Sequence, residues 1–239
     1  MSSDSLKNMI GILGGMGTQA GLDFCNKLAI LNRGKTDQKY PLFILYNKSN
    51  IPKRPENIKK YYNVLKSLVA GCKLLEKDKC KFIVIPCNTA HYWYEDLQKK
   101  IKTPILSMPK EVHKYTKKTC KKYSKIGFLS TEATLKTGVY NKYFDKDFKI
   151  ISPKKIIQKK NVNKAIKLVK MGKVREAEKA IKPAINYLIS MKCKKIILGC
   201  TELPIAIFAY KSFNKIKESK IFIDPNLLLA QVSMNKYRS

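Results

Sequence analysis

Two cysteines, Cys87 and Cys200, stand in matching contexts far apart in the sequence. Each closes an apolar run that begins after a basic residue, Lys81 in the first copy and Lys195 in the second. Short polar residues of the kind that cap helices follow each cysteine. Both copies therefore predict a buried strand, a thiol and a helix. We expect the two halves of the chain to deliver one thiol each to a shared site.

The position of a thiol between a strand and a helix N-terminus determines its chemistry. Free backbone N–H groups and the helix dipole favour the thiolate there, so we expect both Cys87 and Cys200 to be activated. Asn88 and Thr89 can cap the first helix, and Thr201 and Glu202 the second. The same N–H groups form a receptor for a carboxylate. Each half thus offers an acid or base together with an anion clamp.

Two such thiols on opposite sides of one carbon can invert its configuration. One thiolate removes the α-proton, the other thiol returns a proton to the opposite face, and the roles exchange in the reverse direction. The α-proton is weakly acidic, so binding must stabilise the carbanion. No electron-sink cofactor is evident, and we predict none. Because the chain is so rich in lysine, a pyridoxal enzyme with a Schiff-base lysine remains an alternative.

The elements that position these thiols follow an alternating pattern. Short continuous apolar runs predict strands, and amphipathic segments between them predict helices, which is typical of an α/β fold with parallel sheets covered on both faces. Ligands bind at the carboxyl ends of such strands. The strands are expected at residues 9–13, 41–46, 81–87, 103–108, 125–129, 148–151, 195–200 and 221–223, and the helices at 18–31, 56–77, 90–100, 111–122, around Tyr140, 161–169, 174–191 and 226–236.

The repeated cysteine segment divides the chain into two similar α/β lobes. We expect an N-terminal lobe of residues 1–108 plus 219–239 that carries Cys87, and a C-terminal lobe of residues 109–218 that carries Cys200. The stretch Gly14–Gly17 follows the first strand. Its spacing matches neither a dinucleotide fingerprint nor a P-loop. Its glycines predict a close backbone approach at the strand's carboxyl end.

The charge of the chain is unusual. Lysine and arginine total 49 against 17 acids, a net charge of +32. A specific nucleic-acid site prefers arginine forks, but only Arg33, Arg54, Arg175 and Arg238 are arginines and the lysines are spread along the chain. We therefore expect a lysine-rich surface with non-specific, salt-sensitive affinity for polyanions, no specific nucleic-acid partner and no membrane partner.

The cysteine pattern indicates the compartment. The seven cysteines are odd in number and form no CxxC pair, which argues against zinc ribbons and redox dithiols. The polar first residues are not a secretory signal, and no apolar run reaches membrane-spanning length. We expect free thiols in a reducing, cytoplasmic environment. Cys25, Cys72, Cys80, Cys120 and Cys193 are expected to be ordinary packing residues.

Several motifs resemble one enzyme family. They run in order along nearly the whole chain: Gly11–Gly17, Ile51–Arg54, Pro86–His91, Leu129–Tyr140, Val169–Gly172, Leu198–Leu203 and Ile223–Pro225. Together they resemble the cofactor-independent aspartate/glutamate racemase superfamily, and most closely its aspartate racemase branch. The pair Pro-Cys-Asn-Thr-Ala-His and Gly-Cys-Thr-Glu is the specific part of the signal.

The resemblance implies two lobes related by a pseudo-two-fold axis, with the active site in the cleft. It implies Cys87 and Cys200 as the catalytic pair, no cofactor or metal, a small amino-acid substrate and a homodimer. Arg54 and Lys170 fall where a basic pair recognises the side-chain carboxylate of the substrate, although Lys167 or Lys173 could take the place of Lys170. The other residues placed at the substrate are Met16, Asn88, Thr89, Thr131, Thr201 and Glu202.

The sequence departs from the family pattern at three places. Thr18 stands where the glycine turn commonly continues with proline, and Glu132-Ala133 replaces the usual Thr-Gly. Pro55 follows Arg54 and removes a backbone donor beside that clamp. His91 could tune the Cys87 thiol or touch substrate, or have a packing or capping role.

Other functions stay open beside aspartate racemisation. Glutamate or a broad set of amino acids could be the substrate, and hydantoin racemisation or maleate isomerisation are further reactions of the superfamily. The alternative of a different class is an inactive racemase-fold protein that binds anions or nucleic acid. Zinc bound by Cys87, His91, Cys200 and Glu202 is a possible structural alternative, but the pattern is explained without metal.

Overall fold

The computed structural model describes residues 8–32, 36–54, 60–208 and 220–239. The chain divides into two compact units, which are described separately. Unit 1 comprises Met1–Glu111 and Asn226–Ser239, and unit 2 comprises Val112–Pro225. In the described parts of the chain, no helix combines the length and hydrophobicity needed to cross a membrane.

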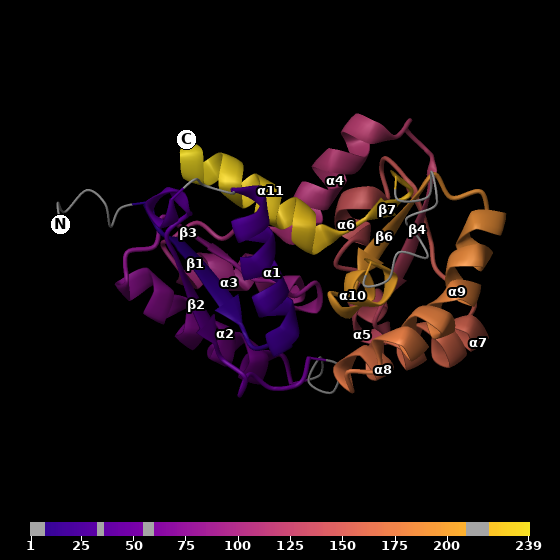
Figure 1. Ribbon diagram of the computed structural model, residues 1–239, viewed down its shortest axis with the longest axis horizontal. Coiled ribbons are helices and arrows are strands. Elements are labelled where there is room, and N and C mark those ends of the chain that lie inside the picture. Colours follow the sequence, from indigo (N-terminus) through magenta and orange to yellow (C-terminus); the bar gives the residue numbers. More distant parts are fainter. Residues whose placement is uncertain (1–7, 33–35, 55–59, 209–219) are drawn as a thin grey trace. The chain divides into compact units, whose positions relative to one another are not determined.

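Unit 1 is built on a three-stranded parallel sheet of order β2-β1-β3 (Figure 1). Strand β1 (Ile10–Gly14) pairs with β2 (Phe43–Asn47) on one side and β3 (Phe82–Val84) on the other. The surrounding helices are α1 (Thr18–Leu31), a 3₁₀ turn (Asp37–Lys39), α2 (Tyr61–Lys77), a 3₁₀ helix (Thr89–Trp93), α3 (Tyr94–Lys100), the start of α4 (Met108–Thr119) and α11 (Pro225–Arg238).

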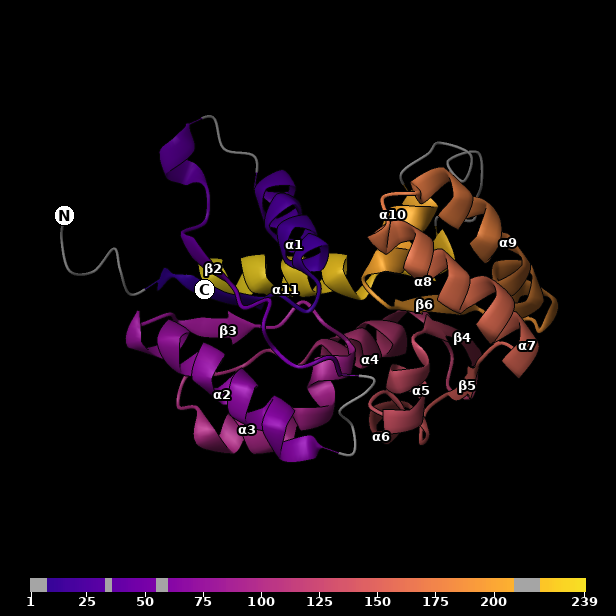
Figure 2. The same ribbon diagram turned by 90° about the horizontal axis from the view of Figure 1, so that it is seen from below.

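Both faces of this sheet are covered, which explains the continuous apolar runs in its strands. Successive residues of a strand point to opposite faces. Ile12 and Val84 pack against α1 and α11, whereas Leu13 and Ile83 belong to the cluster that includes α2 and α3. Figure 2 shows α1 and α11 on one side of the strands and α2 and α3 on the other.

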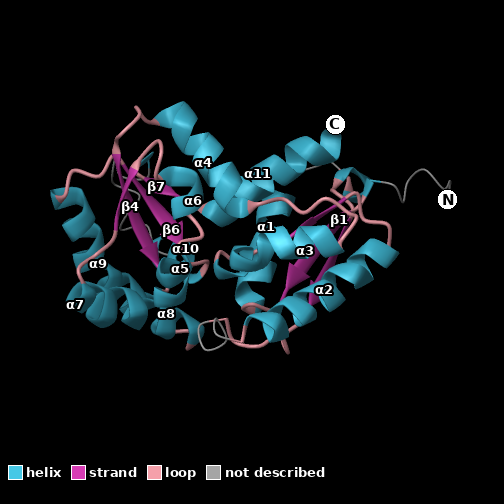
Figure 3. Ribbon diagram, turned by 180° about the vertical axis from the view of Figure 1, so that it is seen from behind, coloured by secondary structure: helices cyan, strands magenta, loops and turns pink. Residues whose placement is uncertain are grey.

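Unit 2 repeats this architecture with four parallel strands of order β5-β4-β6-β7 (Figure 3). The strands are β4 (Lys125–Ser130), β5 (Lys149–Ile151), β6 (Lys195–Gly199) and β7 (Phe222–Ile223). The helices are α5 (Glu132–Thr137), α6 (Asn141–Phe144), α7 (Lys155–Ile157), a π-helical turn (Gln158–Val162), α8 (Asn163–Lys170), α9 (Val174–Ser190) and α10 (Glu202–Phe208). The expected α/β class with helix-flanked parallel sheets is confirmed.

One predicted strand is wrong. Residues 103–108 contribute only an isolated parallel bridge between Ile83 and Ile105. Pro104 has no N–H to donate, so ladder pairing is limited to its carbonyl, which accepts from Ile83, and to the Leu106 N–H. Helix α4 then begins at Met108 rather than Glu111. Pro109 is compatible with that start because the first helical N–H groups need no helical acceptor.

The division into units falls slightly later than we expected at both places. The first boundary lies after Glu111, inside α4, rather than at Met108. The second lies after Pro225 rather than Glu218. Strand β7 pairs with β6, and this pairing assigns Phe222 and Ile223 to unit 2.

The glycine turn after β1 makes the predicted close backbone approach, and the partner is the backbone of Lys48 in the same chain. Gly15 has φ +89°, and a Cβ there would lie 2.3 Å from the carbonyl of Lys48, just after β2. Only glycine fits this combination of conformation and contact. Asn47 donates its side-chain amide to the Thr18 hydroxyl at 3.2 Å. Thr18, which stands where the family pattern commonly has proline, thus joins β2 to α1 through this hydrogen bond.

Candidate active site

Cys87 lies just past the carboxyl end of β3 and is buried in unit 1. Its backbone N–H donates to the Ile85 carbonyl at 2.7 Å, which turns the chain sharply before the 3₁₀ helix. Asn88 and Thr89, which follow directly, are buried as well. The strand ends early and the turn is tight, so the thiol is held at the sheet's carboxyl edge, where the sequence predicted it.

His91 fixes this turn from both ring nitrogens. The Met108 backbone N–H donates to Nε2 at 3.0 Å, so Nε2 is an acceptor and the ring proton is on Nδ1. Nδ1 lies 2.9 Å from the Cys87 carbonyl oxygen and donates to it. The imidazole therefore ties Cys87 to the first residue of α4. Of the roles left open for His91, this geometry supports the structural one, and it leaves no ring nitrogen for zinc.

The other predicted residues of unit 1 gather around the same edge. Met16 and Ile51 belong to the buried cluster that contains Cys87. Arg54, three residues beyond Ile51, is half-buried and donates from Nη1 to the carbonyls of Ile51 at 3.4 Å and Pro52 at 3.2 Å. The guanidinium thus folds onto its own loop. Pro55, the departure beside it, lies outside the described residues.

Cys200 occupies the equivalent place in unit 2, directly after β6. Gly199 precedes it because a Cβ there would lie 2.2 Å from the Phe128 ring. The buried Cys200 thiol donates to Glu202 Oε2 at 2.9 Å, and the Thr201 hydroxyl lies 3.4 Å from the same oxygen. Lys170 at the end of α8 brings its ammonium to 3.5 Å from Glu202 Oε1. Unit 2 therefore brings together four of its predicted site residues.

This environment keeps the Cys200 thiol protonated. Burial raises the pKa of Cys200 well above its usual value, and the Glu202 charge and hydrogen bond raise it further. The Glu202 backbone N–H and the Lys170 ammonium lower that pKa by smaller amounts. Our expectation that the helix N-terminus would favour a thiolate is wrong for Cys200. Helix α10 has only 7 residues, and desolvation outweighs its dipole.

Thr131 caps helix α5 in this structure. Its hydroxyl oxygen accepts from the Thr134 N–H at 3.2 Å and lies 2.9 Å from the Thr134 hydroxyl. Glu132, the departure beside it, accepts from the Asn163 side-chain amide at 2.7 Å. Both contacts hold the loop that follows the central strand β4.

Sequence reasoning missed Gln158, which belongs to the same edge of unit 2. Its Nε2 donates to the Ser130 carbonyl and to Asn163 Oδ1, both at 2.9 Å. Its Oε1 is buried, with no hydrogen-bond partner among the described residues. The residue sits at the start of a π-helical turn, a feature often found at functional sites. No residue pattern marks such a turn.

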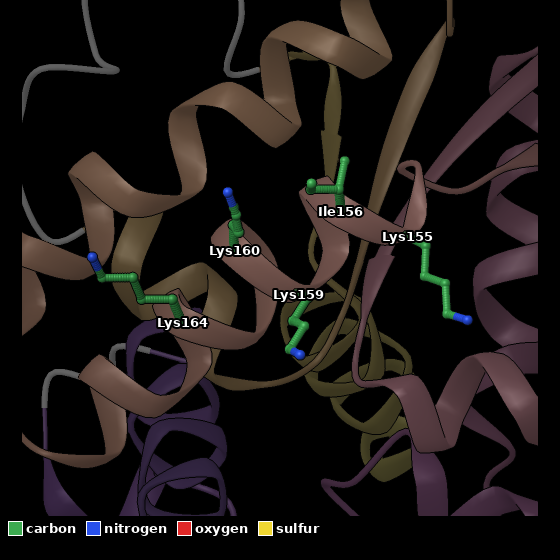
Figure 4. Close-up of a pocket in the computed structure, with 5 residues that line it drawn as sticks. All are labelled: Lys155, Ile156, Lys159, Lys160 and Lys164. Atoms are coloured by element: carbon green, nitrogen blue, oxygen red, sulfur yellow. The ribbon is translucent and has the colours of Figure 1, made fainter.

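A hollow lies elsewhere in unit 2, over α7, the π-helical turn and the start of α8. It has a volume of about 870 Å³ and is lined by Lys155, Ile156, Lys159, Lys160 and Lys164. None of the predicted site residues lines it. Figure 4 shows the lysine side chains pointing in different directions. The hollow therefore does not direct its cations at one anion.

Comparisons with known proteins agree with this geometry. A family model described as Asp/Glu/Hydantoin racemase matches residues 13–232. The broad specificity amino-acid racemase RacX of Bacillus subtilis is 28% identical over 236 residues, covering 96% of this chain and 98% of that protein. The glutamate racemase of Limosilactobacillus reuteri is 30% identical over 163 residues, which cover 66% of this chain and 57% of the relative.

Solved structures give the same result. Aspartate racemase from Picrophilus torridus superimposes with a TM-score of 0.81 at 28% identity, covering 96% of this chain and 94% of that one. Glutamate racemase from Francisella tularensis, at 18% identity and a TM-score of 0.67 over 97% of this chain and 81% of that one, shares the fold. Because the family model spans nearly all of it, the chain belongs to the Asp/Glu/hydantoin racemase family of isomerases.

Proposed function

We propose that this protein interconverts L- and D-aspartate without a cofactor, using Cys87 and Cys200 as a thiolate and thiol pair. The observation that carries the proposal is the repeated corner. In each unit a parallel strand leads to a buried cysteine: β3, the last strand in the order of the unit 1 sheet, precedes Cys87, and β6, an inner strand of the unit 2 sheet, precedes Cys200. Racemisation needs one base and one acid, and a thiolate and a thiol supply both.

The reaction divides into two proton transfers. In one direction of the reaction Cys200 carries the proton and Cys87 acts as the base, and in the reverse direction the two sulfurs exchange these roles. The Cys87 sulfur takes the Cα proton, and the C–H electron pair stays on the carbon. Cys200 then gives its proton to the other face and keeps the S–H pair. Buried N–H groups stabilise the carboxylate on which the charge develops. The scheme requires both sulfurs to reach one carbon.

Aspartate is proposed as the substrate because each unit supplies a cation. Arg54 in unit 1 and Lys170 in unit 2 can bind a second carboxylate. Among the described residues, the hydrogen bonds of the Arg54 guanidinium go to backbone carbonyls, which a charged acceptor would replace favourably. The solved relative named aspartate racemase, alike over nearly its full length, supports this choice. A broad specificity racemase is the second candidate, favoured by the equally extensive match to RacX.

The proposal is tested with purified protein, no added cofactor, and a panel of enantiopure amino acids in deuterated water. We expect aspartate to gain deuterium at Cα and to lose optical activity fastest. Comparable rates for neutral amino acids would replace aspartate specificity with broad specificity. If aspartate, glutamate and the rest of the panel neither exchange nor invert, the racemase assignment is wrong.

Arg54→Met tests the carboxylate clamp directly. We expect KM for aspartate to rise by about 10- to 100-fold, the equivalent of one lost charge-assisted hydrogen bond, with little change for alanine. Lys53→Met, which removes the neighbouring exposed cation, is the matched control. An equal rise for both substrates would show that Arg54 does not read the side chain.

The same proposal places a homodimeric enzyme in the cytoplasm. All seven cysteines are free, and catalytic thiols persist in a reducing compartment. Sedimentation of the purified protein tests the dimer.

A further inference from the structure

Glu202 makes contacts that its position in the chain does not require. It is the first residue of α10, and its side chain turns back toward the sulfur two residues earlier. A carboxylate buried in this way is costly unless donors compensate it. Here the compensation comes from the Cys200 S–H at 2.9 Å, the Thr201 O–H at 3.4 Å and the Lys170 ammonium at 3.5 Å. The acid is thus held at the thiol by its own unit.

We propose that Glu202 is a positioning residue that keeps the proton on Cys200 in the free enzyme, and that Lys170 is the counter-charge that limits its effect. This rests on the proposed function for its consequence in turnover, but the proton itself can be measured without substrate. Glu202 was expected at the substrate; this inference assigns it to the sulfur instead.

The contacts distinguish this role from helix capping. A capping carboxylate accepts backbone N–H groups of the first turn. Among the described residues, the Glu202 carboxylate instead contacts a thiol, a hydroxyl and an ammonium group. The direction of the Cys200 pKa shift agrees, because Glu202 is its largest cause after burial.

Charges on the neighbouring elements act less strongly. Helix α8 contributes Lys170, the main opposing charge. Helix α9 and strand β6 also pack against α10. On α9, Glu176 pairs with Lys173 at 3.8 Å and Glu178 is buried; on β6, the Lys195 ammonium contacts the Lys220 carbonyl. These groups rank below Lys170 in their effect on Cys200.

The consequence for turnover is an enzyme with a preferred resting state. When Cys200 gives its proton to the substrate carbanion, a thiolate is left beside the Glu202 carboxylate. Two like charges at hydrogen-bond distance repel, so the sulfur recovers a proton from solvent once product has left. Cys200 therefore returns to the thiol form while Cys87 releases to solvent the proton that it took from Cα, and the free enzyme favours the form in which Cys87 is the base; the reverse reaction starts from the form with the roles exchanged.

The experiment measures thiolate at Cys200 in substrate-free protein. The rate of alkylation by iodoacetamide at pH 8, read peptide by peptide by mass spectrometry, is proportional to the thiolate fraction. Glu202→Gln keeps the shape and removes the charge. We expect its Cys200 to react about tenfold faster or more, because one unit of pKa is a tenfold change in thiolate.

Lys170→Met should act in the opposite direction. Its side chain is 60% exposed, so the effect of its charge is screened, and we expect Cys200 to react roughly two- to fivefold more slowly. The matched control is Lys173→Met, which breaks a similarly exposed pair with Glu176 and should leave Cys200 unchanged. Cys193, a buried thiol whose pKa burial raises to about 11, is the internal reference.

The outcomes are decisive. The measurement is repeated with a larger reagent, methyl-PEG-maleimide. If the ratio of the Cys200 rates in variant and wild type is the same for both reagents, the change is due to charge. If the ratio differs between the reagents, the change is due to the accessibility of the thiol. Equal Cys200 rates in wild type and Glu202→Gln would overturn the inference, as would faster reaction in Lys170→Met. If Glu202→Gln does not fold, the surface variant Lys170→Met decides alone. Shifted thiol rates without any Cα exchange would contradict the proposed function and leave this inference standing.

Discussion

The Cys87 and Cys200 corners share a backbone plan but hold their sulfurs differently. In each unit a parallel strand beside the first strand ends in a buried cysteine. At Cys87 the partner is His91, which binds the main-chain carbonyl. At Cys200 the partner is Glu202, which binds the sulfur itself. In the described part of the chain, no acidic side chain hydrogen-bonds to the Cys87 thiol.

This difference shows how a duplicated architecture can yield unlike groups. Two identical corners would give two thiols of equal acidity, but a proton exchange across one carbon begins with one sulfur charged and the other neutral. A single carboxylate on one side removes the equivalence. At the Cys87 corner, the neutral imidazole of His91 maintains the same backbone geometry.

The sharpest way to break the comparison is to remove each sulfur in turn. Cys87→Ser and Cys200→Ser should each lower racemisation by about 10²- to 10⁴-fold, because each removes one proton-transfer group. The remaining thiol can still exchange the α-proton of one enantiomer. We expect the two variants to retain deuterium wash-in for opposite enantiomers, which mass spectrometry of the recovered amino acid measures. Retention for the same enantiomer in both variants would contradict two opposed bases.

Two glycines with positive φ, one in each unit, test how much a close backbone contact adds to the stability cost of an alanine substitution. Gly15→Ala must move the Lys48 backbone and should lower the free energy of unfolding by roughly 3 kcal/mol or more. Gly172, beside Lys170, also has positive φ, +76°, but has nothing within 4 Å of an added Cβ. Gly172→Ala should therefore cost only about 1–2 kcal/mol. Urea denaturation measures both values, and equal losses would show that the contact at Lys48 is unimportant.

Replacement of His91 sharpens the comparison at the Cys87 corner. His91→Leu leaves the Cys87 carbonyl and the Met108 N–H without the imidazole, and should cost about 1–3 kcal/mol of stability. Racemisation should fall, while alkylation of Cys200 is unchanged. His113→Leu, the other histidine, which pairs with Asp147 in unit 2, is the control. An altered Cys200 rate in His91→Leu would show that the corners are not independent.

The last prediction concerns a buried thiol without a catalytic role. Burial, with a smaller contribution from Glu76, raises the pKa of Cys72 to about 12 from 9.0. A raised pKa stabilises the fold below pH 9 and loses that contribution as the pH rises toward 12, by about 1.4 kcal/mol per pH unit. Cys72→Ala should therefore lose less stability than wild type between pH 9 and 10.5. Cys120→Ala, at a partly exposed thiol, is the control; identical pH slopes for all three proteins would refute the shift.

The sequence predicted the architecture well because buried parallel strands are continuous apolar runs. Helix α1 has the predicted bounds, Thr18–Leu31, since glycines end the preceding strand clearly. The predicted strand around Ile105 is wrong because an apolar run does not show whether the neighbouring strand can form a full ladder of hydrogen bonds with it. Both cysteines fall at strand ends as expected.

Details of the site depend on tertiary contacts, which spacing cannot reveal. The Lys170–Glu202 pair needs α8 packed against α10, and the two hydrogen bonds of His91 need the start of α4 beside the 3₁₀ helix. The acidity of Cys200 was misjudged for the same reason. A helix start is visible in the sequence, whereas the degree of desolvation depends on the folded neighbours.

The interruption of unit 1 by unit 2 has a consequence for how the protein is made. Unit 2 is one continuous segment, Val112–Pro225, and is fully synthesised before unit 1 has all its parts. One face of the unit 1 sheet is buried by Leu229, Ala230 and Met234 of α11. In a growing chain this face of the sheet, with Ile12 and Val84, therefore lacks the cover of α11 until that helix has been made. The Cys200 unit can fold during translation before the Cys87 unit has its last helix.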